Sequence, residues 1–273
     1  MLNIIKADMY RIFRGKGFYI TIILLFVTIA LQTAVSSKAA VGIYNTEEAE
    51  IDTIEEFTEE VLLAPEAFTG STAAFEMMEN TDTLLYFLLP FIIFIAAADF
   101  STDTVKNVLS NGVPRVKYYL SKLILSCAFC LLFLLLNIIV PIVTATVLRG
   151  FGGELNVDFI LRLLRPFSAQ LFMCLSVTCV GIFLVFATKR TAAVNGAYIS
   201  FCLLPMLIMY ILFMLNNKLE FLFKYDVISN IRMLVHIDVA DSADIIRAFA
   251  VGAFYILAST IGGIAIFKRS EIK

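Results

Sequence analysis

The sequence predicts an all-α, polytopic membrane protein with six transmembrane helices, organised as a single domain over residues 1–273. Six long apolar stretches occupy nearly half of the chain, and 60% of all residues are hydrophobic. Soluble domains average about 45–50% apolar residues. A helix needs about 20 apolar residues to cross ~30 Å of hydrocarbon, because each residue adds ~1.5 Å. We therefore read the stretches as membrane spans and disfavour a soluble helical bundle.

The six apolar stretches contain no Asp, Glu or Arg. Five of them are long enough to cross a bilayer. The second has only 16 residues, and it reaches full length by continuing into 99–102 or back into the preceding helix. The expected spans are Phe18 to Val35, Thr83 to Ala98, Leu123 to Leu148, Phe167 to Thr188, Ala192 to Leu215 and Ala248 to Phe267.

Residues 1–17 are too charged for the apolar core of a signal peptide. Apolar side chains recur here at helical spacing, with basic residues on the other faces, which predicts an amphipathic helix lying along the cytoplasmic membrane interface. The alternative is a basic flank that only sets the orientation of the first span. The apolar positions are Leu2, Ile5, Met9, Ile12 and Phe13.

Basic residues set the predicted orientation of the chain. With a cytoplasmic N-terminus, 13 of the 21 Lys and Arg residues fall on the inside, although the inside segments are the shorter ones. This asymmetry orients membrane proteins during insertion. We expect a multi-pass protein of the plasma membrane with both termini in the cytoplasm. Its net charge of −2 gives no basis for binding nucleic acid.

The first outer segment, 36–82, is an acidic extracellular loop with twelve carboxylates between Glu47 and Asp82. Asn45 and Glu48 have the spacing of a helix start, which predicts an acidic helix to about Leu63, and a second short helix follows at 71–79. Two interpretations stay open. The loop attracts cationic substrate to the outer mouth of the protein, or it is only a solvated connection. A second extracellular segment, 216–247, is too apolar for an idle loop.

The cytoplasmic link between spans two and three, 99–122, contains a predicted short helix. Thr102 or Thr104 can start it, and Val105, Val108 and Leu109 share one of its faces. Asn111-Gly112 ends it, because these residues tolerate left-handed backbone. Pro114 then begins the next segment, in which Arg115, Lys117 and Lys122 are expected to anchor span three at the lipid headgroups.

This link resembles the permease subunits of type-2 ATP-binding-cassette (ABC) exporters. The resemblance extends along the chain through the basic N-terminal helix, the six spans and the basic C-terminal tail. Two features depart from it: Asp103 stands where the family often has glycine, and the acidic loop exceeds that of the shortest members. The matching residues in the link are Asp99, Asp103-Thr104, Lys106-Asn107-Val108-Leu109, Pro114-Arg115 and Tyr119-Leu120-Ser121-Lys122.

The resemblance implies a transport subunit that is not itself an enzyme. The chain has no phosphate-binding G-x-x-x-x-G-K-[ST] loop, so ATP and Mg would be bound by a separate ABC ATPase subunit, and this chain would hold no cofactor or metal. A second permease subunit, identical or different, would complete the path across the lipid bilayer. The residues implied to couple to the ATPase are Asp99, Asp103, Thr104, Val105, Lys106, Val108, Leu109 and Arg115.

The transported substrate is the least determined property. Apolar spans without fixed charge and an acidic outer loop favour an amphipathic antimicrobial or toxin peptide, with hydrophobic drugs or lipid-linked glycans as the alternative. Asn137, Asn195 and Tyr198 are candidates for the substrate path, although polar groups in spans usually serve helix packing.

Two other classes of protein fit the sequence less well. A secondary transporter needs groups that bind a coupling ion and usually two repeated halves, and neither is evident. An intramembrane metalloenzyme needs several ligands near the bilayer, whereas the chain has a single histidine, His236, in an outer segment. The five cysteines all fall inside predicted spans and are expected to pack as small apolar residues.

Overall fold

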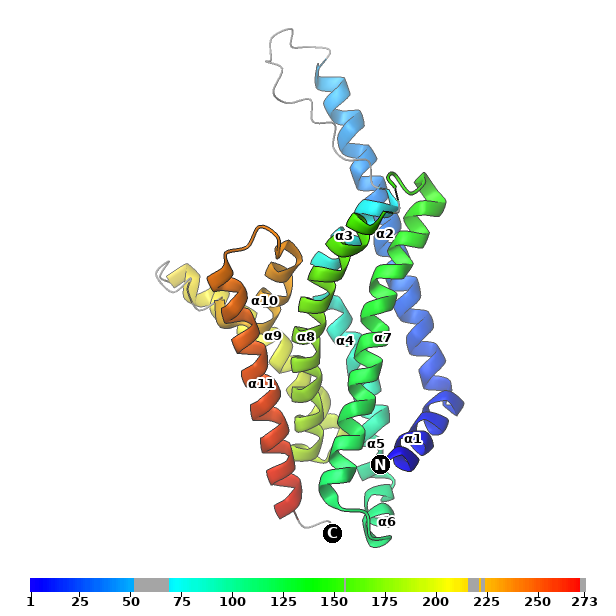
Figure 1. Cartoon of the computed structure of the whole chain (residues 1–273), viewed down its shortest axis with the longest axis vertical. Helices are drawn as coiled ribbons and strands as arrows, with labels where there is room; N and C mark the ends of the chain where they lie inside the picture. Colours follow the sequence, from blue (N-terminus) through cyan, green and yellow to red (C-terminus); the bar gives the residue numbers. More distant parts are fainter. Residues whose placement is uncertain (52–68, 155, 216–220, 222–223, 271–273) are drawn as a thin grey trace.

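The computed structural model describes residues 1–51, 69–154, 156–215, 221 and 224–270. These residues form helices and short connections, with no strand among them. Six of the helical segments are long and apolar enough to cross a membrane, which confirms an all-helical, multi-pass membrane protein. The long helices run side by side along the length of the molecule (Figure 1).

The N-terminal region consists of α1 (Leu2–Arg14), α2 (Lys16–Ile51) and α3 (Gly70–Glu79). The predicted helix start at Asn45 is wrong, because α2 continues through this residue as one helix of 36 residues. Extending an existing helix adds a hydrogen bond for each ordered residue, whereas starting a new one orders a whole turn for a single bond. Residues 52–63 of the predicted acidic helix lie outside the described part, and the predicted helix at 71–79 is confirmed as α3.

The second span is assembled from three helical segments. These are α4 (Asp82–Ile92), the π-helix η1 (Ile93–Ala97) and α5 (Ala98–Ser101). Together they make a span of 20 residues, so the short apolar stretch reaches full length by extending at both ends. Pro90 precedes the π-helix and has no N–H for the helical ladder, which is a common setting for a change in helix type.

The remaining described helices follow one another in three groups. A short helix α6 (Thr104–Ser110) leads into the long α7 (Arg115–Arg149). The antiparallel helices α8 (Val157–Thr188) and α9 (Thr191–Leu215) are joined at Lys189-Arg190. A short α10 (Val227–Met233) with the 3-10 turn η3 (Leu234–His236) precedes α11 (Ser242–Arg269). Asn156 and Asp226 cap α8 and α10 by accepting hydrogen bonds from the backbone N–H of Phe159 and Ser229.

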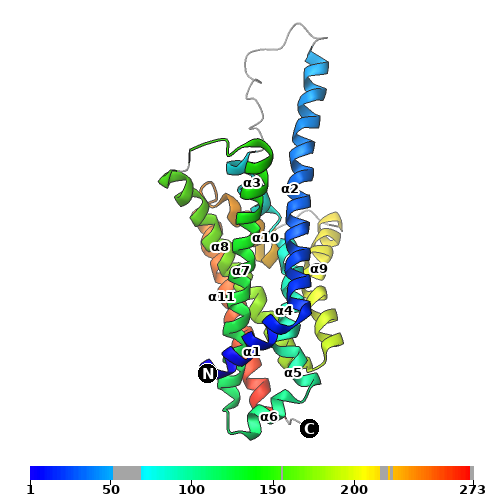
Figure 2. The same ribbon diagram turned by 90° about the vertical axis from the view of Figure 1, so that its right-hand side faces the viewer.

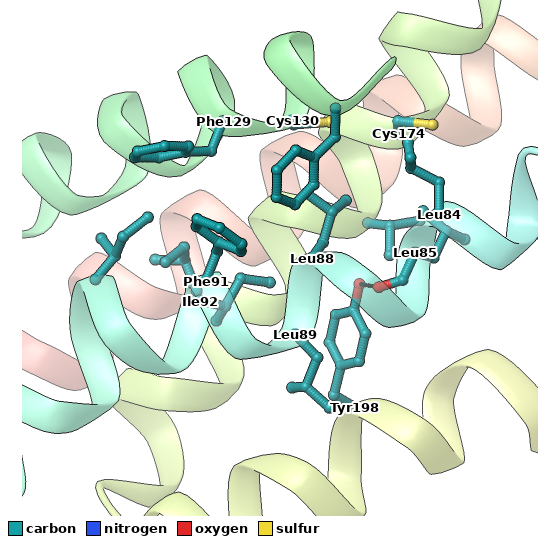
Figure 3. Packing of buried hydrophobic residues seen from close by; sticks show 14 of the residues in the cluster. Leu84, Leu85, Leu88, Leu89, Phe91, Ile92, Phe129, Cys130, Cys174 and Tyr198 are labelled. Atoms are coloured by element: carbon teal, nitrogen blue, oxygen red, sulfur yellow. Dashed lines mark hydrogen bonds between the residues drawn. The ribbon is translucent and has the colours of Figure 1, made fainter. Parts of the chain in front are cut away.

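The core lies where α4, α7 and α8 meet, and α11 and α9 pack against α8. Figure 3 shows one face of α4 turned toward Phe129 and Cys130 of α7, with Tyr198 of α9 beneath it. Tyr198 donates a hydrogen bond to the backbone carbonyl of Leu85 at 3.0 Å. The five cysteines lie within α7, α8 and α9, and four of them are buried in this packing.

Both chain ends and α6 lie at one end of the helix bundle, and α3 and α10 lie toward the other (Figures 1 and 2). We call the first of these the termini end.

Candidate functional site

The helix α6 is held between two residues with left-handed backbone. Asp103 precedes α6 with φ 53°, and Gly112 follows it with φ 81°. Glycine favours this region because it has no Cβ, and aspartate is one of the few residues that also enter it. Asp103 therefore adopts at the start of α6 a backbone conformation that glycine favours. Its carboxylate lies 2.8 Å from the Nζ of Lys106.

One side of α6 packs against the chain itself. Val105 is buried, and Val108 and Leu109 are partly buried against the main core. The three residues therefore share a face, as their spacing predicts, but this face turns toward the bundle. The side chains of Asn107 and Ser110 are exposed on the outer side of the helix. A partner protein that approaches the termini end would meet these polar residues first.

A cluster of charged side chains lies between α1 and the two helices that flank α6, namely α5 and α7. This buried charge cluster comprises Asp8 and Arg11 of α1, Asp99 of α5, and Tyr118 and Lys122 of α7. The Lys122 ammonium lies 2.6 Å from a carboxylate oxygen of Asp8 and 2.6 Å from one of Asp99. The side chain of Lys122 is only 1% exposed, and that of Asp8 is 8% exposed. The cluster joins α1 to the helices on both sides of α6.

Arg11 and Tyr118 complete the coordination of the two carboxylates. Arg11 donates to Asp99 and lies 3.2 Å from a carboxylate oxygen of Asp8, and the Tyr118 hydroxyl donates to Asp99. The guanidinium of Arg11 also donates to the backbone carbonyls of Phe94 and Ile95 in the π-helix, at 3.2 and 3.4 Å. Arg11 therefore fastens α1 to the second span through both a charge and the backbone.

The cluster is electrically balanced, with two carboxylates and two cations. Burial raises the pKa of the Asp8 carboxyl above its ordinary value, and the neighbouring Lys122 opposes this rise. Burying charges is costly unless each is paired and hydrogen-bonded, which these contacts achieve. Removing one of its charged members leaves an uncompensated charge beside side chains that are almost fully buried, those of Lys122 and Asp99 above all.

The placement of Lys122 corrects one prediction. The sequence pattern predicts that Lys122 reaches the headgroups, but its ammonium points into the protein and pairs with Asp8 and Asp99. The sequence analysis did not identify Asp8 and Arg11, which are 114 and 88 residues from partners in the cluster. The one available signal was an acidic residue in an otherwise basic helix, three positions before an arginine. Lys117 is exposed.

Arg115 contacts the C-terminal tail. Its Nη1 donates to the backbone carbonyls of Phe267, Lys268 and Ser270 at 2.8 to 2.9 Å. These carbonyls lie at the C-terminal end of α11, where a helix leaves backbone acceptors for side-chain donors, so the arginine caps that helix end together with the Ser270 hydroxyl, which donates to the Phe267 carbonyl at 3.1 Å. The hydrogen bonds of Arg115 thus connect the start of α7 to the C-terminal end of α11.

The three candidates for a substrate path lie in different surroundings. Tyr198 is fully buried and bonded to Leu85, and Asn195 is half-buried in the first turns of α9. Asn137 is buried and donates to the carbonyl of Met77 at 3.3 Å and to the Thr81 hydroxyl at 3.4 Å. The chain does not bring these three side chains together, and two of them hold neighbouring helices in place.

Gln170 of α8 forms a polar contact that the sequence analysis missed. Its amide nitrogen donates to the carbonyls of Met78 (2.8 Å) and Ile231 (3.1 Å), and Thr81 donates to its oxygen at 3.2 Å. The side chain is fully buried. Gln170 therefore connects α3 and α10 to a membrane span at the end opposite the termini.

His236 lies at the surface in η3, with its Nε2 3.3 Å from a carboxylate oxygen of Glu79. Within the described residues, no group of three or more His, Cys, Asp or Glu side chains could hold a metal ion. No family model and no curated protein matches the chain. The class of the protein must therefore be argued from the sequence pattern and from the geometry of the termini end.

Proposed function

We propose that this chain is the membrane-spanning subunit of an ATP-driven ABC exporter and that it couples to a separate ATPase subunit. The observation that supports this most is the short helix α6, which lies at the termini end between α5 and α7, two helices that the buried charge cluster ties to each other and to α1. A simple connection between two spans would need neither the short helix nor ion pairs between the helices that flank it.

The geometry provides a route for mechanical coupling. Asp99 precedes α6 in the chain and Lys122 follows it, and the Lys122 ammonium lies 2.6 Å from a carboxylate oxygen of Asp99. A force applied to the outer side of α6 would therefore reach the second and third spans together, and α1 would move with them through Asp8 and Arg11. Packed interfaces transmit displacement in this way because they do not deform continuously.

The partners follow from the same proposal. ATP and Mg are bound by the ATPase, which docks at the cytoplasmic termini end, and a second permease subunit, identical or different, completes the path. Helices α2, α9 and α11 present broad apolar faces that the described part of the chain leaves largely exposed. In a bilayer these faces meet lipid or a second subunit.

The outer side of α6 provides a test of the docking site. Asn107→Arg and Ser110→Arg place a charge on exposed positions without disturbing the packed face, so we expect unchanged thermal stability but at least about tenfold less co-purified ATPase, equivalent to about 1.4 kcal/mol. The measurement is affinity purification of the chain co-expressed with a candidate ABC ATPase subunit. Asn80→Arg, exposed at the far end, is the matched control.

Undiminished assembly with both α6 variants would contradict the docking site. Aspartate at Val108 or Leu109 is a weaker test, because these residues pack against the core and their replacement would also affect folding.

We propose an amphipathic, cationic peptide of the antimicrobial or toxin type as the cargo. The support is the twelve carboxylates between Glu47 and Asp82, together with apolar span faces that carry no fixed charge. We expect such peptides to stimulate the ATPase activity of the reconstituted complex several-fold, and neutral peptides of equal length to have little effect. Equal rates across the panel would exclude this cargo and favour hydrophobic drugs or lipid-linked glycans.

A further inference from the structure

A small pocket lies where α1 turns into α2. It has a volume of about 190 Å3, and its walls come from the turn itself and from the second span. The lining residues are Arg11, Ile12, Gly15, Gly17, Phe18, Phe94 and Ala98. Apart from Arg11 this lining is apolar, and Arg11 already uses its donors on Asp8, Asp99 and two backbone carbonyls.

The size of the pocket restricts its occupant. Pockets for drug-sized ligands measure roughly 300–1,000 Å3. An apolar cavity of roughly 150 Å3 is sufficient to bind benzene. A volume of about 190 Å3 therefore fits a short length of hydrocarbon and is too small for a folded or helical peptide. The pocket is not the transport path.

The position of the pocket indicates that an acyl chain of a membrane lipid could enter it. Gly17 and Phe18 are among the first residues of the span that begins at Lys16, and Ala98 is near the end of the span that finishes at Ser101. The pocket thus lies at the level where two spans leave the hydrocarbon layer. Acyl chains of membrane lipids end in their headgroups at this level.

The charge beside the pocket selects among lipids. Arg14 and Lys16 are exposed on either side of Gly15, and the Arg14 guanidinium donates to the Tyr10 hydroxyl at 3.0 Å. The first 20 residues contain one acidic residue, Asp8, which is buried and paired with Lys122. No carboxylate in this part of the described chain neutralises the two exposed cations. A phosphate group would fit beside them.

The geometry points to a binding site for an anionic phospholipid at the turn between α1 and α2, with one acyl chain in the pocket and the phosphate against Arg14 and Lys16. The site requires only that the protein spans a membrane, so it does not depend on the proposed exporter function. Its bound lipid would contact Arg11 and the π-helix, and would support the joint that holds α1 to the second span.

Photo-crosslinking in phosphatidylcholine nanodiscs tests this site. Phosphatidylglycerol with a diazirine in one acyl chain is added at a low mole fraction, and mass spectrometry maps the labelled residues. We expect labelling at residues 11–18 and 94–98, about tenfold stronger than with the matching phosphatidylcholine probe, because each basic residue near an anionic headgroup contributes about 1 kcal/mol. Inorganic phosphate should not compete, since the acyl chain supplies part of the affinity.

Two variants separate the pocket from the charges. Gly15→Leu adds a bulky side chain to the pocket lining at a position whose backbone accepts any residue, because its φ is −77° and ψ 128°. An added Cβ would lie 3.3 Å from the carbonyl oxygen of Ile12 and 3.5 Å from that of Arg11, so the first carbonyl must shift slightly and thermal unfolding is measured alongside. The variant should reduce labelling about fivefold or more. Gly196→Leu, in open space on α9, is the matched control and should label normally. Arg14→Gln with Lys16→Gln should remove the preference for phosphatidylglycerol.

Either of two results would overturn the site. The first is labelling at the turn that Gly15→Leu does not reduce, which would show a general lipid contact. The second is equal labelling by both probes in the unmodified protein, which would show that the headgroup is not recognised.

Discussion

Replacing Lys122 by methionine is expected to lower the free energy of unfolding by about 3–5 kcal/mol, the usual cost of breaking a buried ion pair. Methionine keeps most of the apolar part of the side chain but removes the charge. The carboxylates of Asp8 and Asp99, each 2.6 Å from the lysine ammonium, then share Arg11 as their only remaining cation within the cluster. One negative charge is left unbalanced in a buried site.

A second substitution tests this explanation. Lys122→Met combined with Asp8→Asn restores the charge balance and leaves the contacts of Asp99 with Arg11 and Tyr118 intact, so part of the lost stability should return. Lys117→Met, an exposed lysine on the same helix, should change stability by less than about 0.5 kcal/mol.

The measurement is thermal unfolding in detergent, followed with a thiol-reactive fluorophore. The five free cysteines lie in the spans, and the four buried ones react only as the helices separate, whereas the partly exposed Cys127 sets the baseline. If Lys122→Met unfolds at the temperature of Lys117→Met, or if the double variant is no more stable than the single one, the cluster does not join α1 to the spans.

Replacing Gln170 by methionine is expected to cost about 1–3 kcal/mol and to loosen the end of the bundle opposite the termini. The carbonyl of Ile231 loses its donor, and the Thr81 hydroxyl loses an acceptor, in a site with no exposed surface. A buried group left without a partner costs about 1–3 kcal/mol. Hydrogen bonds between membrane helices average only ~0.6 kcal/mol, because their groups usually find other partners. Gln170 bonds to two separate backbone segments at once, which makes replacement partners scarce.

Hydrogen exchange measured by mass spectrometry locates this effect. Faster exchange is expected in α10 and in the last turn of α3, with no change at α6. Gln32→Met, at a half-buried glutamine in α2, is the matched control. Unchanged exchange in α10 would show that its packing against α8 does not depend on the Gln170 amide.

Much of the architecture follows from local properties of the sequence. The apolar lengths predict the six helices that are long and apolar enough to cross a membrane. The left-handed backbone at Gly112 ends α6 where the Asn111-Gly112 pair predicts it. These features depend on neighbouring residues in the chain, which is why one sequence is sufficient to predict them. The helix start predicted at Asn45 is wrong for an equally local reason. Extending α2 through Asn45 is more favourable than ending that helix and starting a new one at a capping residue.

The sequence by itself thus determined the six apolar spans and the presence of the short helix α6. Only the tertiary structure decided that the apolar face of α6 turns inward and that Lys122 points into the protein. The partners of Asp8 and Arg11 are 114 and 88 residues away, and no local pattern encodes such pairings. A charged residue at the end of a span can face headgroups or a buried counter-charge. The choice depends on which helices pack beside it.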